Sequence, residues 1–375
     1  MECKHFGECG SCSLFAIDYN TQIKSKVKRV TNLLEPFIYD DLEVFFGKNH
    51  HYRARSEFRI WHTGDRCDYG MGNIAKNGTI IIDECPKVVN AIASRMPLIL
   101  EEINSSLILS KKLFSIEFLA TTTDEVLITM IYHKKLGDDW IEVAKPLEEK
   151  LNIKLIGRSR KQKINISDDF VIEKLTINNI LYKYAQYESG FTQPNPEVNV
   201  KMIEWALTQT KLIDGGDLLE SYCGLGNFTI PLSTEFDRVL ATEISKKSIA
   251  SAKINCELNN ILNIEFIRLS SSEMSEALSK KREFRRLAHI DINSYNFSTV
   301  LVDPPRMGLD SDTIALISDI KYIIYISCNP ETLARDLEEL SKTHKVVNQA
   351  IFDQFPYTEH IESGVFLEMK NAKSS

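Results

Sequence analysis

The chain has 375 residues, enough for two or three domains with substantial cores. Its composition, 43% hydrophobic and 26% charged, is that of a soluble globular protein, and no apolar run is long enough to span a membrane. The formal net charge of −7 does not by itself indicate a nucleic-acid-binding protein, and the N-terminus lacks the apolar core of a signal peptide. We therefore expect a cytoplasmic protein whose eight cysteines are thiols, metal ligands or catalytic groups rather than disulfides.

Three cysteines, Cys3, Cys9 and Cys12, stand within the first twelve residues, with five and then two residues between them. Such close spacing in a cytosolic protein is unusual for packing and typical of a metal site. A tetrahedral sulfur site needs a fourth ligand, for which Cys67 and Cys85 are the candidates. We prefer Cys85 because a proline follows it, as is common for cluster ligands. Spacing alone does not separate an iron–sulfur cluster from zinc.

Residues of roughly 40–185 have the mixed pattern of a separate α+β domain, and a helix precedes it. Apolar residues at helical spacing predict an amphipathic helix over Tyr19–Leu34. The segment Tyr52–Trp61 alternates as a strand does, with Arg53, Arg55 and Arg59 on one face and apolar residues on the other. Such a row could contact phosphates, and a solvated outer face is the alternative. We also predict strands at Thr79–Ile82, Leu113–Ala120, Val126–His133, Lys154–Ser159 and Leu181–Tyr184, and helices at Val88–Ile103 and Asp138–Leu151.

Basic residues gather in three stretches, within His50–Arg59, Lys154–Lys163 and Lys280–Arg286. Charge runs are more often solvated faces, so each stretch alone is weak evidence for a binding surface. Together they predict that any binding to a nucleic acid is salt-sensitive, with an affinity that falls steeply as the salt concentration rises.

From residue 189 onward, strands alternate with helices, which predicts a doubly wound, Rossmann-like α/β domain with a parallel sheet. A helix is expected over Glu197–Thr210, and Cys256 lies on the inner face of a later helix, where it belongs to the core. We divide the chain into an N-terminal cysteine motif and helix (1–38), a central α+β domain (39–188) and this last domain (189–375). Its predicted strands are Asp217–Ser221, Val239–Thr242, Ile264–Ile267, Thr299–Val302, Tyr322–Ile326, Lys345–Phe352 and Val365–Met369.

A glycine loop follows the first strand of the last domain. Gly224 and Gly226 allow the backbone to approach a ligand closely, and Glu243 ends the second strand, where an acid can hold ribose hydroxyls. A dinucleotide site would have a third glycine where this chain has Asn227 and its neighbours. We therefore expect a ligand without pyrophosphate, such as S-adenosylmethionine. The alternative is that the glycines form no more than a turn.

Cys328 follows the buried run Tyr322–Ile326, and Asn329 and Pro330 after it read as the cap and first position of a helix. A helix N-terminus lowers the pKa of a thiol, so Cys328 is placed to become a thiolate in the crevice beyond the strand ends. The usual alternative for a lone cysteine is a small buried core residue. Asp303, at the end of the preceding strand, is directed into the same crevice by two prolines.

Glu362, just ahead of the last strand, is a candidate general base, and His360 competes with it for that role. A thiolate, a carboxylate base and a methyl donor suit one reaction. Addition of the thiolate to carbon-6 of uracil makes carbon-5 nucleophilic enough to take a methyl group. The base then removes the carbon-5 proton and the thiol is expelled.

Taken together, these segments resemble the RNA 5-methyluridine methyltransferases and, within them, the tRNA (uracil-5-)-methyltransferases. The resemblance extends over most of the chain, into the central domain, and the combination of motifs is highly specific. The matching segments are Tyr52–Arg59, Phe191–Asn195, Leu219–Phe228, Asp303–Arg306, Ser327–Leu333 and Asp353–Glu362.

The resemblance implies Cys328 as the nucleophile and Glu362 as the proton acceptor, acting on the T-loop uridine-54 of tRNA. Phe191 is a stacking partner for the base once that base has left its stack. The implied RNA partner is tRNA, with tmRNA and ribosomal RNA as further candidates, and no obligate protein partner is evident. The residues that it implies for methyl-donor binding are Gln193, Tyr222, Asn227, Glu243 and Asp303, the last of which could instead face the uracil edge.

The N-terminal pattern of Cys3, Cys9, Cys12 and Cys85 resembles the [4Fe–4S] site of the ribosomal-RNA branch of the family, which favours a cluster over zinc. That branch often carries an additional N-terminal RNA-binding barrel, for which this chain has no room. A 23S ribosomal-RNA uridine methyltransferase, an RNA chaperone that does not need catalysis and an iron–sulfur redox protein are therefore kept as alternatives. The 5-methylcytosine enzymes have a Pro-Cys motif, whereas Arg306 follows the proline here.

Overall fold

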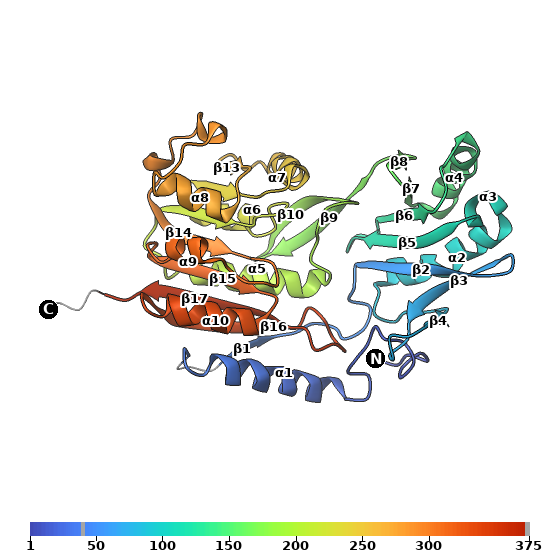
Figure 1. Ribbon diagram of the computed structural model, residues 1–375, viewed down its shortest axis with the longest axis horizontal. Coiled ribbons are helices and arrows are strands. Elements are labelled where there is room, and N and C mark those ends of the chain that lie inside the picture. Colours follow the sequence, from blue (N-terminus) through green and yellow to red (C-terminus); the bar gives the residue numbers. More distant parts are fainter. Residues whose placement is uncertain (39–41, 372–375) are drawn as a thin grey trace.

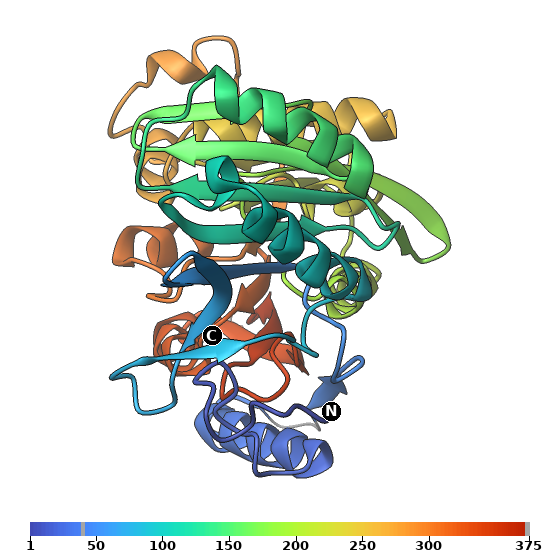
Figure 2. The same ribbon diagram turned by 90° about the vertical axis from the view of Figure 1, so that its right-hand side faces the viewer.

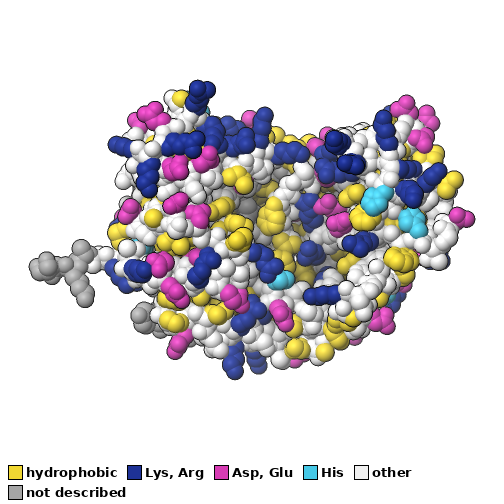
Figure 3. All heavy atoms as spheres, viewed as in Figure 1, with side chains coloured by type: hydrophobic (Ala, Val, Ile, Leu, Met, Phe, Trp, Pro, Cys, Tyr) yellow, Lys and Arg dark blue, Asp and Glu magenta, His cyan; other side chains and the backbone are white. Residues whose placement is uncertain are grey.

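The computed structural model describes residues 1–38 and 42–371, which form two lobes joined by a two-stranded ribbon (Figure 1). One lobe is built on an eight-stranded sheet and the other on a seven-stranded sheet. The surface is hollowed between the lobes, with Lys and Arg side chains around the hollow (Figure 3). Within the described ranges, no helix is both long and apolar enough to cross a membrane.

The eight-stranded sheet contains, in spatial order, β1 (Glu43–Phe45), β16 (His344–Phe352), β17 (Glu362–Met369), β15 (Tyr322–Ser327), β14 (Phe297–Val302), β11 (Asp217–Ser221), β12 (Val239–Thr242) and β13 (Ile264–Ile267). Strands β11 to β15 run parallel, as predicted. The expectation of an all-parallel sheet is wrong for β17, which runs antiparallel between β15 and β16. A short loop joins β16 to β17, and a parallel neighbour would need a longer crossover connection.

Helices cover both faces of this sheet. Val30 and Leu34 of the N-terminal helix share a core with Leu333 and Leu337, although some 300 residues separate the two pairs in the chain. Cys256 packs in the core on the opposite face, as predicted. The helices are α5 (Pro196–Thr210), α6 (Thr229–Leu232) and α7 (Lys246–Asn259) on one face, and α1 (Tyr19–Leu34), α8 (Ser271–Leu278), α9 (Ser311–Ile317) and α10 (Pro330–Leu340) on the other.

The central lobe has a largely antiparallel sheet with one parallel pair, β6 with β7. Its helices cover the outer face and lie in front of the strands in Figure 2, so the other face is turned toward the first lobe (Figure 1). The strands, in spatial order, are β4 (Thr79–Ile82), β3 (Arg66–Gly72), β2 (Arg55–Thr63), β5 (Leu113–Ala120), β6 (Val126–Tyr132), β7 (Lys154–Ser159) and β8 (Gln162–Asn165), and the helices are α2 (Asn90–Ser105), α3 (Leu107–Ser110) and α4 (Asp138–Leu151).

Strand β2 begins at Arg55, three residues later than predicted. The backbone N–H groups of Tyr52 and Arg53 donate to the carbonyl of Lys87, and that of Ala54 donates to Pro194, so this stretch joins segments instead of extending the sheet. Strands β3 and β8 were not predicted. The two glycines and the charged residues of β3 give it a weak strand propensity.

The ribbon joining the lobes consists of β9 (Phe170–Ile177) and β10 (Ile180–Tyr187), of which the sequence predicted the second. Its turn places Asn178 and Asn179 at positive φ, 46° and 66°, as a two-residue type I′ hairpin requires. Leu175 and Tyr184 of the ribbon belong to the core of the first lobe. The ribbon therefore fixes the start of the segment that leads into that lobe's ligand cavity.

Candidate active site

Cys328 and Glu362, the two residues predicted to act on the base, follow and begin neighbouring strands. Strands β15 and β17 pair antiparallel, with Ser327 opposite Ser363. Continuing this register by one residue places Cys328 opposite Glu362. Side chains directly opposite each other in an antiparallel pair share one face, with their Cβ atoms about 5 Å apart. The antiparallel orientation of β17 thus brings the thiol and the acid to one place.

The Cys328 thiol is half-buried, so it is not sealed within the core. Burial, together with the carboxyl groups of Glu362 and Asp303, raises its pKa to about 11, although Arg306 acts in the opposite direction. The expectation of a lowered pKa is therefore wrong. Desolvation and two nearby acids outweigh the helix terminus and the single cation. The thiol needs a proton acceptor or an incoming positive charge before it can attack.

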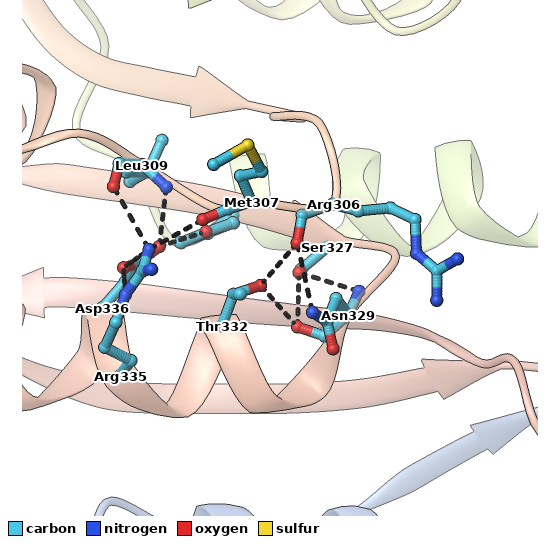
Figure 4. A network of polar contacts seen from close by, with 9 residues as sticks. Arg306, Met307, Leu309, Ser327, Asn329, Thr332, Arg335 and Asp336 are labelled. Atoms are coloured by element: carbon cyan, nitrogen blue, oxygen red, sulfur yellow. Dashed lines mark hydrogen bonds and ion pairs between the residues drawn. The ribbon is translucent and has the colours of Figure 1, made fainter.

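Helix α10 begins after Asn329, but the side chain of Asn329 does not cap it. Instead, Asn329 Nδ2 donates a hydrogen bond of 3.1 Å to the backbone carbonyl of Arg306. The Thr332 hydroxyl donates to the same carbonyl at 3.4 Å, and the Ser327 hydroxyl donates to the carbonyl of Asn329 at 3.0 Å (Figure 4). The loop after Asp303 is thereby tied to the start of the helix that follows the thiol.

The same loop is also held from below by Asp336, which is fully buried in α10. Its Oδ2 accepts hydrogen bonds from the Leu309 backbone at 2.9 Å and from the Tyr325 hydroxyl at 2.7 Å. The neighbouring Arg335 donates to the carbonyls of Met307 and Leu309. Figure 4 shows the Arg306 guanidinium pointing away from this network. The network fixes the backbone of the loop and leaves that side chain available.

Two acids face the thiol, and the pKa of each is raised. Burial raises the pKa of Glu362 to about 8, helped by Asp303 and opposed by Arg306. Burial also raises the pKa of Asp303 to about 7. The exposed His360 accepts at Nδ1 a hydrogen bond of 3.3 Å from Arg306, and partial burial and that cation lower the pKa of His360. Glu362 acts electrostatically on Cys328, which favours it over His360 as the base.

A cavity opens at the carboxyl ends of β11 and β14, beside this cluster. Four of the predicted donor-binding residues line it, namely Gln193, Tyr222, Asn227 and Asp303. The Asn227 side chain is fixed by a reciprocal pair of hydrogen bonds with Asn199, at 2.8 and 2.9 Å. Because Asp303 lines the cavity and also acts on the thiol, it lies between the donor site and the place of reaction.

Glu243, the fifth predicted donor-binding residue, is not among the described residues that line this cavity. Its carboxylate accepts hydrogen bonds from the backbone of Gly224 at 3.2 Å and of Ser245 at 2.7 Å. Tyr222 and Gly226 stand at φ values of +65° and +89°, so the turn is tight and one of its left-handed positions is not a glycine. Glu243 therefore braces the glycine loop from the neighbouring strand.

Two residues of the site were missed in the sequence. Glu220, which lines the cavity, is 1% exposed, and its Oε2 has no hydrogen-bond partner among the described residues. Burial raises its pKa to about 8, with the Thr229 hydroxyl close enough to oppose this. The signal was an acid directly before a glycine loop. Arg306, the cation beside Cys328 and Glu362, had the weaker signal of a charged residue after two prolines.

The central lobe contributes a clamp. Arg55 Nε donates to Glu117 at 2.6 Å, and its two terminal nitrogens donate to the carbonyls of Glu188 and Gly190. The prediction that Arg55 contacts phosphate is therefore not supported, because intramolecular partners occupy the side chain. The clamp holds the segment just before Phe191, whose side chain is 73% exposed at the rim of the cavity.

The N-terminal cysteines lie against the central lobe. The backbone of Cys9 forms an isolated antiparallel β-bridge with that of Asn73. Lys87 Nζ donates to the carbonyl and hydroxyl of Ser11 at 2.8 and 2.7 Å. Burial raises the pKa of Cys12 to about 11, while Lys87 opposes this. These contacts pin a segment that has little hydrophobic content of its own.

Cys3, Cys9 and Cys85 all act electrostatically on Cys12, so the four predicted ligands are neighbours. Cys67 is instead enclosed in the core of the central lobe, 3.4 Å from His62 Nδ1. In residues 1–38 and 42–371, no group of three or more Cys, His, Asp or Glu side chains is close enough to hold a metal ion. Four thiols are the donor set that an iron–sulfur cluster or zinc would take.

A doubly wound sheet, a glycine loop and a ligand cavity at the carboxyl ends of the strands define the class of Rossmann-like methyltransferases. The family model for tRNA (uracil-5-)-methyltransferases matches residues 18–370. The chain belongs to this family.

Similar proteins agree with this assignment. The chain is 62% identical to a tRNA/tmRNA (uracil-C(5))-methyltransferase of Sulfurovum sp. (strain NBC37-1), over 99% of this chain and 100% of the relative. It is 49% identical to the protein of that name from Aliarcobacter butzleri (strain RM4018), over 98% and 99% of the two chains. A crystal structure of Pyrococcus abyssi tRNA (uracil-54, C5)-methyltransferase with S-adenosyl-L-homocysteine shares the fold, with a TM-score of 0.73, 23% identity, and coverage of 95% of this chain and 85% of that chain.

Proposed function

We propose that the protein transfers a methyl group from S-adenosylmethionine to carbon-5 of uridine-54 in the T-loop of tRNA. The observation that carries this proposal is the pairing of Ser327 with Ser363, which brings the adjoining residues Cys328 and Glu362 together beside the cavity lined by Asp303. The names of the relatives, which act on uracil carbon-5 of tRNA and tmRNA, support the substrate. Because tRNA is matured in the cytoplasm, we expect the protein to work there.

The covalent step requires a thiolate. The Cys328 sulfur forms a bond to carbon-6 of the uracil, and the electron pair of the carbon-5–carbon-6 double bond moves toward carbon-5. Carbon-5 then takes the methyl group, and the sulfur–methyl bond of the donor breaks to leave S-adenosylhomocysteine. Arg306, beside both Cys328 and Glu362, offsets the negative charge that appears during the attack.

The second step removes a proton. Glu362 accepts the carbon-5 proton, the double bond re-forms and the bond between carbon-6 and sulfur breaks. A carboxylate with a pKa of about 8 is a stronger base than an exposed glutamate, and it can still be ionised near neutral pH. Burial of Glu362 thus suits it to remove a proton from carbon.

The residues around the cavity fit a cationic nucleoside. Glu220 and Asp303 are acids whose pKa values are raised by burial, and one oxygen of Glu220 has no hydrogen-bond partner among the described residues. The positive charge of S-adenosylmethionine would compensate these carboxylates when it binds. We propose Gln193, Tyr222 and Asn227 as further donor-binding residues, and Glu243 as the support of the glycine loop.

We propose that residues 39–188 contribute the RNA-binding domain and residues 189–375 the methyltransferase domain, which β1 and α1 complete, with 1–38 as the cysteine motif and helix. The open face of the central sheet is turned toward the hollow between the lobes, and Arg59, Trp61 and Phe114 are exposed on that lobe. A base must leave its stack to reach Cys328, and the exposed ring of Phe191 offers a stacking surface to it.

We also propose that Cys3, Cys9, Cys12 and Cys85 hold a [4Fe–4S] cluster. The support is the donor chemistry of four thiols, the electrostatic effect of Cys3, Cys9 and Cys85 on Cys12, the enclosure of Cys67 in the core of the central lobe, and the cation of Lys87 near Cys12, which favours a bound thiolate. Such a cluster would join the N-terminal segment to the central lobe covalently through its ligands.

The test of the main proposal uses a tRNA transcript with 5-fluorouridine at position 54, together with S-adenosylmethionine. Fluorine leaves no carbon-5 proton to abstract, so a denaturation-resistant complex of protein and RNA should accumulate. The Cys328→Ala variant should form none, whereas Cys256→Ala, which removes a core thiol, should behave as wild type. Absence of the complex in the wild-type protein would overturn the proposal.

The resemblance of the cysteine motif to the ribosomal-RNA branch keeps a second substrate in view. Incubation of the protein with total RNA from a deletion strain, followed by mass mapping of 5-methyluridine, separates the candidates. Modification of the T-loop in tRNA and tmRNA supports the proposal, and modification confined to 23S ribosomal RNA would replace it.

A further inference from the structure

The loop between β16 and β17 leads directly into Glu362 and is held by elements from the other end of the chain. Its Tyr357 lies at φ +64°, a left-handed conformation that a bulky residue adopts only under constraint. The Tyr357 N–H donates to Gln22 Oε1 at 2.9 Å, and its carbonyl accepts from the Leu14 backbone at 3.1 Å. The N-terminal ammonium of Met1 donates to the Tyr357 hydroxyl at 2.7 Å.

A buried ion pair anchors the same loop to α1. Lys26 Nζ lies 2.7 Å from Asp353 Oδ1, with the two side chains 3% and 1% exposed. Lys26 also donates to the carbonyl of Phe355 at 3.1 Å, and the Tyr19 hydroxyl donates to the second carboxylate oxygen of Asp353 at 2.9 Å. A pair this deeply buried is strongly coupled, because removal of either partner leaves an uncompensated charge.

Apolar contacts between this loop and α1 extend to the residue before Glu362. Ile361, the residue before Glu362, shares a core with Val30 and Leu34 of α1. Glu362 then begins β17 opposite the end of β15, so a shift of the loop moves the acid relative to Cys328. The Cys328 side is held separately, by Asn329 and Asp336. The nucleophile and the acid therefore have different supports.

We propose that Lys26, through Asp353, is a positioning residue for Glu362, so that α1 governs the proton-abstraction step and leaves the attack by Cys328 largely unaffected. This inference rests on the proposed function. Because Cys12 acts electrostatically on Tyr357, the cysteine segment borders the same loop, and its disturbance should affect the same step.

The experiment compares two reactions of one variant, Lys26→Met combined with Asp353→Asn, which removes both charges of the pair. With 5-fluorouridine RNA, adduct formation requires attack and methyl transfer but no proton abstraction. With unmodified RNA, release of the product requires attack, methyl transfer and proton abstraction. We expect an adduct rate within about twofold of wild type and release of 5-methyluridine RNA slowed by about tenfold or more. The methylated covalent complex on unmodified RNA should accumulate.

The matched control is Arg238→Met combined with Asp217→Asn, which removes a 2.7 Å ion pair between the start of β11 and the residue before β12 in the same sheet. It should change neither rate. Tyr19→Phe removes the hydroxyl that donates to Asp353 and keeps the ion pair. It should slow product release by a smaller factor and leave adduct formation unchanged. The inference is overturned if the pair variant and Tyr19→Phe slow both reactions equally, or if neither reaction changes. Failure of the wild-type protein to form the adduct would instead refute the proposed function.

Discussion

Asn329 and Arg306, from two different strand-to-helix connections, are joined by a hydrogen bond of 3.1 Å between a side-chain amide and a backbone carbonyl. The amide that would ordinarily cap α10 is thus used to hold the neighbouring loop. Because Cys328 precedes Asn329 in the chain, the bond fixes the backbone at Cys328 relative to the backbone at Arg306.

The first prediction concerns Asp336, which supports this loop from within α10. In Asp336→Asn, an amide nitrogen that cannot accept replaces either Oδ2, which accepts from Leu309 and Tyr325, or Oδ1, which accepts from Arg335, so one of these two sets of bonds is lost. We expect unfolding to become easier by about 1–3 kcal/mol, as for the loss of a buried charge-assisted hydrogen bond. Adduct formation with 5-fluorouridine RNA should also slow, because Arg306 is less well placed. Chemical denaturation and adduct kinetics measure the two effects.

The control for Asp336→Asn is Asp319→Asn, at an acid just before β15. Asp319 is exposed, and its side chain forms no hydrogen bond or ion pair with the residues that the structure describes, so stability and adduct rate should both match wild type. An Asp336→Asn variant as stable and as fast as wild type would show that the network does not support the loop.

The second prediction concerns Glu362→Gln. The carboxamide retains the shape of the side chain but cannot accept the carbon-5 proton. On unmodified RNA, the reaction should stop at the methylated covalent complex, which denaturing electrophoresis detects. Full turnover in this variant would contradict the assignment of the base, and His360→Ala would then be the next variant to measure.

The same substitution changes the dependence of stability on pH. The pKa of Glu362 is raised in the folded protein from 4.5 to about 8, so folding favours the neutral acid. The stability that this group contributes is present below pH 4.5 and is lost as the pH rises through about 8. Relative to wild type, Glu362→Gln should therefore be more stable at high pH than at low pH, as thermal melting would show. An unchanged difference between the two proteins would contradict this.

The third prediction concerns the pH dependence of the reaction. Glu362, with a pKa of about 8, must lose its proton to act as a base, and Cys328, with a pKa of about 11, must lose its own to attack. The value of kcat/KM should therefore rise with pH from about 6 to about 9, because it reports the groups of the free enzyme. A flat profile over that range would show that neither ionisation limits the reaction.

The fourth prediction distinguishes two arginines of β2. Arg59 is exposed and makes a cation–π contact with Phe114, whereas Arg55 is bonded to Glu117 and to the segment before Phe191. Arg59→Ala should weaken RNA binding and reduce its dependence on salt by about one counterion. Arg55→Ala should lower activity with little change in that dependence. Binding titrations at several salt concentrations measure the slope of log affinity against log salt concentration. An equal loss of slope in both variants would contradict the prediction, because it would mean that both side chains contact phosphate.

The fifth prediction concerns the cysteine motif. Protein purified without oxygen should contain iron and sulfide, and Cys85→Ser should lose both. Cys67→Ser tests the assignment, because Cys67 is enclosed in the core of the central lobe and its loss should leave the iron content unchanged. Zinc in place of iron, or iron lost from the Cys67 variant, would contradict the proposed ligand set.

The sequence predicted those parts of the structure that depend on local pattern. Strands such as Leu113–Ala120 and Asp217–Ser221 were located at their observed bounds, because their apolar runs are bordered by turn residues. Cys328 stood out through its place between a buried strand and a helix. Strand β3, which is interrupted by glycines, gave no comparable pattern, and its pairing depends on contacts with β2 and β4.

Other features depend on burial and on neighbours from distant segments. The raised pKa of Cys328 results from Glu362 and Asp303, which other strands bring to it. Arg55 resembled a phosphate ligand on its strand, and its real partners, Glu117 and the segment ending at Gly190, are remote in sequence. The sequence pattern identifies which residues could react, but it does not reveal the neighbours that set their pKa values or occupy their side chains.

The edge strand β1 and the helix α1 complete the first lobe from the opposite end of the chain. A fragment starting at residue 189 would leave β16 with an unpaired edge and would expose Leu333 and Leu337 to water. Such a fragment should aggregate, so this half of the enzyme cannot be moved into another protein by itself. Chimaeras should exchange the segment between β1 and α5 and retain both ends of the polypeptide.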